Sequence, residues 1–202
     1  MDTATEKSEL TLAAIVNAAL EMAAKEGLSS LSLGEVARQL GISKSGVFSR
    51  VGSLEALQQA VLEEFNRGYQ EQVFNPAMAL PRGLPRLNAL VEGWITRLCS
   101  TTGCIYIAGA FEYDDVVSPI RNHLQNNILR VRAMLRRTIV QALEIGHLRP
   151  DTDPDQLSFE IYSLIIGMMH DARFLREPLA ETRTRNAYHR LASSYRNFNY
   201  HD

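Results

Sequence analysis

Apolar positions recur every three or four residues along most of the chain, the spacing of one face of an α-helix. The first clear stripe covers residues 11–26 and ends at Gly27, a residue suited to a helix C-cap. No segment of any length alternates with the two-residue period of a strand. The pattern therefore predicts an all-α protein.

Local signals divide the next segment into two short helices and a long one. Ser32 and the glutamate three residues later have the spacing of a capping box, which predicts a helix over 32–40. Beyond a glycine turn, Ser43 caps a second short helix over 43–51, and a long helix follows over 54–72. This is a helix-turn-helix arrangement, which needs the flanking helices to bury it. We expect its core to come from Leu12, Ile15, Ala19, Leu31, Val36, Ala37, Leu40, Ile42, Val47, Val51 and Leu57.

The rest of the chain predicts a larger helical bundle. Three prolines and a glycine between Phe74 and Pro85 predict a loop that links the two parts. Asp153 followed by Pro154 is a strong helix start. The further helices are expected over 86–99, 104–113, 118–146, 154–176 and 180–197. About nine helices result, with a three-helix head over 1–53, a connecting helix over 54–72, and a body over 73–202 that binds a ligand and dimerises.

Composition excludes several classes of protein. The 202 residues are 46% hydrophobic and 22% charged, as in an ordinary globular chain, and no apolar run is long enough to span a bilayer. The N-terminus has no apolar signal segment, so we expect a cytoplasmic protein with no membrane partner. Cys99 and Cys104 have no zinc-site neighbours and are expected to be inert thiols, with a redox role left open. No catalytic motif and no cofactor or metal site is present, so we expect no enzyme.

The net charge of −2 gives no sign of nucleic acid, but the local charge does. Between Val36 and Leu54 there is no acidic residue, whereas Arg38, Lys44 and Arg50 are basic. Positive charge is thus concentrated at the turn and the second short helix, where a phosphate backbone could be bound.

Residues 15–57 resemble the DNA-binding head of the tetracycline-repressor family. The matching features are Ala18, Ala19, Gly27, Ser32, Val36, Ala37, Leu40, Gly41, Ile42, Ser43, Val47, Phe48, Val51, Glu55, Ala56 and Leu57. The glycine–cysteine pair at 103–104 and the Asp–Pro helix start are similar to one branch of the family's sensing body. The resemblance implies a ligand-responsive regulator, most often a repressor, that binds a palindromic operator as a dimer and is released by a small-molecule effector.

The resemblance also implies the residues that contact double-stranded DNA. Base-edge or phosphate contacts are expected from the second short helix, and the two capping serines can bind phosphates. The expected set is Ser32, Arg38, Ser43, Lys44, Ser45, Gly46, Phe48, Ser49 and Arg50. Phe48 replaces the usual tyrosine and Leu54 the usual lysine, so two phosphate contacts are lost and a shallow salt dependence follows. From the residues alone, Phe48 and Val51 are more often core than contact.

Two features of the body point to its partners. The helix over 154–176 is apolar on two faces, and the family's last two long helices form a dimer interface, so we expect a homodimer there. An effector pocket is expected among Trp94, Tyr106, Phe111, Tyr113, His123, Phe159, Tyr162, Met169 and His170. Five arginines between Asp115 and Glu144 form either a solvated face or a site for an anionic effector.

One alternative function stays open, that of a helical adaptor or sensing protein whose head no longer binds DNA. The near-neutral head and the two departures at Phe48 and Leu54 favour it. The sequence leaves open the identity of the effector, the operator and the regulated genes, and the choice between repressor and activator.

Overall fold

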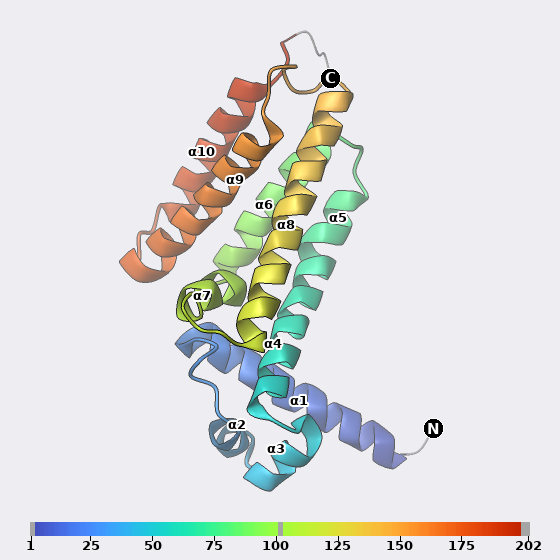
Figure 1. The fold of residues 1–202 in the computed structure, drawn as a ribbon, viewed down its shortest axis with the longest axis vertical. Coiled ribbons are helices and arrows are strands. Elements are labelled where there is room, and N and C mark those ends of the chain that lie inside the picture. The colour runs from blue at the N-terminus through green and yellow to red at the C-terminus, as the bar shows by residue number, and fades with distance from the viewer. Residues whose placement is uncertain (1–2, 101–102, 199–202) are drawn as a thin grey trace. The chain divides into compact units, whose positions relative to one another are not determined.

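The computed structural model describes residues 3–100 and 103–198, and it confirms the predicted all-α class, since no strand occurs in these residues (Figure 1). Counted as continuous helices, the described residues form nine, as expected. The α-helices are α1 (Thr3–Glu26), α2 (Leu33–Leu40), α3 (Lys44–Val51), α4 (Leu54–Tyr69), α5 (Asn75–Met78), α6 (Leu84–Ser100), α7 (Ile105–Glu112), α8 (Pro119–Glu144), α9 (Pro154–Met169) and α10 (Ala180–Tyr195). Two π-helical segments, η1 (Gln70–Phe74) and η2 (His170–Leu175), extend α4 and α9.

The loop predicted between Phe74 and Pro85 is wrong in its first half. Helix α4 passes through η1 into α5 and ends only at Met78. Pro76 is the second residue of α5 and directly follows the π-helical segment η1. The wider turn of η1 precedes it, so the helix continues where the proline alone predicted a break.

The chain divides into two compact units. The first consists of Met1–Gly68 and Cys104–Asn126, and the second of Tyr69–Gly103 and Asn127–Asp202. This division describes packing and does not test the functional boundary at residue 53, which stays a prediction.

In the first unit, helices α1, α2, α3 and α4 enclose an apolar core. Ile15, Ala19, Val36, Val47 and Leu57 are fully buried in it. Leu31 and Ala37 are buried as well, whereas Leu40 and Val51 are half-buried. The prediction that Leu12 and Ile42 belong to the core is wrong. Leu12 is 39% exposed beside an open groove, and Ile42 is 37% exposed in the turn before α3.

In the second unit, α9 packs against both α6 and α10. The buried side chains Leu90, Ile95, Ile161, Ile165 and Tyr188 form its centre. Helix α9 begins as predicted, because the Asp153 carboxylate accepts from the N–H groups of Asp155 and Gln156 at 2.8 and 3.3 Å and Pro154 occupies the first turn. Within the described residues, no helix is both long and apolar enough to cross a membrane.

Candidate nucleic-acid interface and sensing body

Local hydrogen bonds fix both helices of the helix-turn-helix. The Ser32 hydroxyl accepts from the Glu35 N–H at 3.1 Å, and the Ser43 hydroxyl accepts from the Gly46 N–H at 3.0 Å. Gly41 ends α2 with φ +65°, a left-handed conformation that glycine adopts without steric cost. The backbone between α2 and α3 is therefore set by residues that the sequence alone identified.

Helix α3 has one buried face and one exposed face. Val47 is fully buried, while Lys44, Ser45, Phe48 and Ser49 are exposed. Short polar side chains and a lysine on the exposed face would allow the edges of the bases in a DNA groove to approach the helix closely.

The three basic residues of this segment differ in their surroundings. Arg38 donates through Nε to a Glu35 carboxylate oxygen at 3.1 Å and makes a second ion-pair contact with the other oxygen. The hydrogen bond from Arg38 lowers the pKa of Glu35, and the same bond raises the pKa of Arg38. Arg50 donates to the Gly46 carbonyl at 2.9 Å, and Lys44 is exposed at the start of α3. Lys44 and Arg50 therefore carry the positive charge of α3, while Arg38 of α2 is paired with Glu35.

The two positions that depart from the family pattern both lie at the surface. Phe48 is 55% exposed and Leu54 is 37% exposed. The expectation from the residues alone that Phe48 belongs to the core is wrong, because Val47 takes the inward position of α3.

Helix α7 is bound to the first unit's α1–α2 loop and to α4. The Glu112 carboxylate accepts from the Ser29 N–H at 2.8 Å. The Gln58 amide donates to the Leu28 carbonyl at 3.0 Å and to the Tyr113 hydroxyl at 3.1 Å. Burial raises the pKa of Tyr113. Sequence reasoning missed Gln58 and the Ser29–Glu112 contact, since partners 55 and 83 residues apart leave no local signal.

Of the nine expected effector residues, four belong to two ring clusters, one in each unit, and three lie on the surface; Met169 is buried in the second unit, and Tyr113 accepts from Gln58 as described above. In the first unit, Tyr106 lies 5.9 Å from Phe65 and stacks with His123 at 6.2 Å between ring centroids. The Tyr106 hydroxyl donates to the Leu62 carbonyl at 3.0 Å and lies 3.3 Å from Nε2 of His123. Tyr106 is buried, so this cluster combines apolar rings with two polar groups.

The second unit contains the other cluster. Trp94 is buried and lies 6.1 Å from the Tyr69 ring and 5.9 Å from the Tyr162 ring. The Arg132 guanidinium lies over Tyr162 at 5.7 Å from the centroid. Met169 is buried in the same unit.

Three expected effector residues lie on the surface. Phe111 is 66% exposed at the end of α7, Phe159 is 55% exposed on α9, and His170 is exposed against Phe174 on η2. None of the three belongs to a ring cluster described above. No group of His, Cys, Asp and Glu within the described residues could hold a metal ion.

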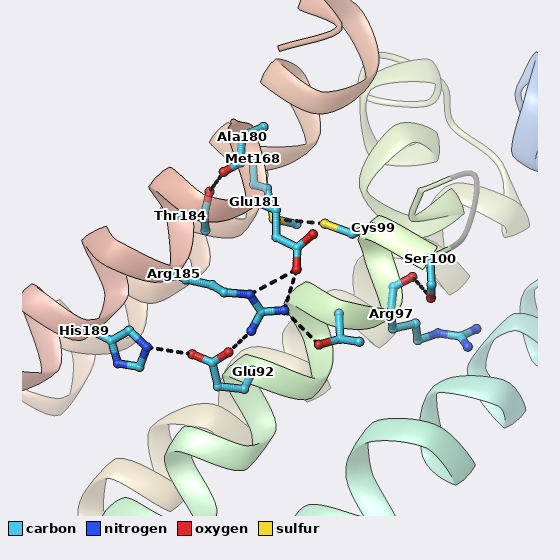
Figure 2. Close-up of polar contacts among 11 residues, drawn as sticks. Glu92, Arg97, Cys99, Ser100, Met168, Ala180, Glu181, Thr184, Arg185 and His189 are labelled. Carbon is cyan, nitrogen blue, oxygen red and sulfur yellow. Dashed lines mark hydrogen bonds and ion pairs between the residues drawn. The ribbon is translucent and has the colours of Figure 1, made fainter. Parts of the chain in front are cut away.

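A polar network joins α6 to α10 in the second unit (Figure 2). Arg185 of α10 forms ion pairs with Glu92 of α6 and with Glu181, the latter at 2.7 Å, and donates to the Thr96 hydroxyl at 2.9 Å. His189 extends the network, with its Nε2 atom 3.3 Å from Glu92. Because these bonds join one helix to the other, they hold α10 in register on α6.

The chain matches known families along most of its length. Residues 15–61 match the model described as bacterial regulatory proteins, tetR family, and residues 83–188 match the tetracyclin repressor-like, C-terminal domain. A search of curated proteins gives no match.

Solved structures share the fold. A TetR transcriptional regulator from Chloroflexus aurantiacus J-10-FL is 21% identical, with a TM-score of 0.81 over 93% of this chain and 95% of that chain. AibR in complex with isovaleryl coenzyme A and operator DNA is 20% identical, with a TM-score of 0.68 over 86% of this chain and 95% of that chain. A cysteine mutant of CifR complexed with double-strand operator DNA is 16% identical, with a TM-score of 0.74 over 90% of this chain and 94% of that chain.

The C-terminal match alone covers more than half of the 202 residues, and the N-terminal match covers the helix-turn-helix. Members of this family regulate transcription, which confirms the prediction that the chain is not an enzyme. The chain belongs to the tetracycline-repressor family of DNA-binding transcription regulators.

Proposed function

We propose that the protein is a dimeric repressor that inserts α3 of each protomer into the major groove of a palindromic operator and leaves it when a small-molecule effector binds the body. The observation that carries the proposal is the two-faced α3, with Val47 in the core and Lys44, Ser45 and Ser49 outward. The N-terminal cap and the turn before it fix the position of such a helix, so that its exposed face can enter the groove as a rigid element. AibR and CifR, which share the fold, are described in complex with operator DNA.

The exposed face of α9 and η2 supports the homodimer. Phe159 is 55% exposed, and Phe174 and Leu175 on η2 are 78% and 56% exposed. At the outward-facing Gly167, a side chain would meet nothing within 4 Å in the single chain. Exposed apolar side chains along a helix are stabilised by burial against a partner. A second protomer related by a two-fold axis would bury them.

Each ring cluster, taken within its own unit, is a candidate site for an effector that is largely apolar or aromatic. Rings and a few polar groups are the usual lining of small-molecule sites. Of the expected effector residues, Tyr106, His123, Trp94 and Tyr162 belong to these clusters, and Arg132 adds a cation beside Tyr162.

Helix α7 supplies a route from effector to head. Tyr106 lies in its first turn, and Glu112 and Tyr113 at its other end bind Ser29 and Gln58. An effector that displaces Tyr106 turns the short helix and thereby shifts the loop before α2 through Glu112. The effector thereby favours a state in which α3 is wrongly placed for DNA, which is a population shift set by its different affinities for the two states.

The test is binding to the duplex upstream of the protein's own gene, measured by fluorescence anisotropy. Lys44→Ala with Arg50→Ala is expected to weaken binding at least about 1000-fold, since the dimer loses four contacts and each costs about 1–3 kcal/mol. The matched control is Arg130→Ala with Arg137→Ala, which removes the same charge from exposed positions on α8 and should change the dissociation constant little. Light scattering checks that each variant remains a dimer.

Two results would contradict the proposal. Equal losses in the two double variants would mean that general charge, rather than α3, binds the duplex. No retardation of any duplex by the unaltered protein at low salt would favour the adaptor function instead.

A further inference from the structure

An exposed aromatic ring lies in the middle of the polar face of α3. Phe48 is 55% exposed, and the side chains beside it on this face are Lys44, Ser45 and Ser49. The fully buried Val47 already fills the inward position of this turn. Within the described residues, Phe48 takes part in no ring stacking or cation–π contact.

The ring has no group that can bind a phosphate or a polar base edge, because it carries no donor or acceptor. Any favourable binding free energy from this ring must therefore come from burial of apolar surface. In the major groove, the edges of the bases are donors and acceptors except for one apolar group, the C5-methyl of thymine. A phenyl ring on the groove-facing side of a helix thus distinguishes thymine from cytosine, which lacks that methyl.

The position of Phe48 along α3 also places the thymine. Phe48 follows Lys44 by one helical turn, a rise of about 6 Å at 1.5 Å per residue. Base pairs are spaced by about 3.4 Å, so the thymine lies within about two base pairs of the Lys44 contact. Ser45 and Ser49 flank the ring with side chains too short to hold it off the groove floor.

We propose that Phe48 is a specificity-determining residue, and that it selects one thymine in each half of the operator by contact between its ring and the C5-methyl group. This inference rests on the proposed function, since it requires α3 to enter the major groove. It assigns Phe48 a direct role in reading a base, where the hydroxyl of a tyrosine could have bound the backbone.

The test begins with selection of an operator from random duplexes by the full-length protein. Each symmetric pair of thymines is then replaced by deoxyuridine, which removes only the methyl groups, and dissociation constants are measured by anisotropy. Loss of the methyls from one pair, within about two base pairs of Lys44, should cost the unaltered protein about 15-fold in affinity, since burial of one methyl is worth about 4-fold per half-site. The Phe48→Ala variant should bind the thymine and deoxyuridine operators within about 2-fold of each other.

Phe198→Ala is the matched control, because Phe198 is 82% exposed and lies far along the chain after α10. It should respond to deoxyuridine as the unaltered protein does. Insensitivity of the unaltered protein to every deoxyuridine pair, or an equal loss with Phe48→Ala, overturns the inference while leaving the proposed function standing. Failure to select any duplex overturns both.

Discussion

The salt dependence of operator binding follows from the charges on α2 and α3. Each phosphate neutralised by a basic side chain releases counterions and contributes about 0.9 to the slope of log K against log salt. Lys44 and Arg50 are the basic residues of α3, whereas Arg38 is held by the Glu35 carboxylate. Two contacts per head make four for a dimer, so we expect a slope of about −3.6.

This slope corresponds to a loss of about 150-fold in affinity between roughly 50 and 200 mM salt. Anisotropy titrations of a fixed operator duplex at several salt concentrations measure it directly. A slope of about −5.4 or steeper, equivalent to six or more phosphates, would refute the assignment, because it would require Arg38 or further cations to take part.

The pairing of Arg38 with Glu35 can be tested in the same titration. Glu35→Gln removes the carboxylate, frees Arg38 and should steepen the slope by about 1.8 for a dimer. Glu55→Gln is the matched control, since Glu55 is an exposed acid in the first turn of α4. If the two variants steepen the slope equally, the effect is one of general charge and the pairing does not restrain Arg38.

Three further predictions concern the body and the stability of the chain. Gly83→Ala should lower the free energy of unfolding by at least about 2 kcal/mol in urea titrations, because Gly83 has φ +96° and a Cβ would lie 2.3 Å from Nδ1 of His147. Gly34→Ala, in open space inside α2, should instead raise it by up to about 1 kcal/mol, and the same sign for both would contradict this geometry. Cys99, whose pKa is raised to about 11 by burial and by Glu181, should react with iodoacetamide only slowly at pH 8 and faster as the pH approaches 11; fast reaction at pH 7 would contradict the inert thiol. Gly167→Trp should fold normally yet run as a monomer in light scattering, and an unchanged dimer would place the interface elsewhere.

The parts of the fold that the sequence predicted depend on contacts between near neighbours. The caps at Ser32, Ser43 and Asp153 each bind an N–H two or three residues away, so the residues that make the signal also make the bond. The helices over α2, α3 and α9 therefore begin where the sequence placed them. The helical continuation past Phe74 escaped prediction because a π-turn absorbs the effect of Pro76, and no local pattern marks such a turn.

The sequence identified the basic residues of the candidate site as a group but not their pairings. The sequence identified Arg38, Lys44 and Arg50 as a basic group, and only the structure distinguishes the paired Arg38 from the other two. Periodicity could not decide whether Val47 or Phe48 faces the core, because adjacent apolar residues on a short helix satisfy the pattern equally well. Exposure of the Phe48 side chain settles that question, and the DNA contacts themselves stay predictions.

The geometry of α7, within the first unit, suits the proposed route from effector to head. Its eight residues make a rod of about 12 Å at 1.5 Å per residue, with Tyr106 near one end and Glu112 at the other. Gly109 lies between them and approaches α8 closely, since a Cβ there would lie 3.1 Å from the Leu124 side chain. Under the proposed function, a displacement of the Tyr106 end would turn the helix about that contact and move the Glu112 end in the opposite direction. Because the Glu112 carboxylate accepts directly from the Ser29 N–H, the proposed motion would pass to the loop before α2 through this one side chain.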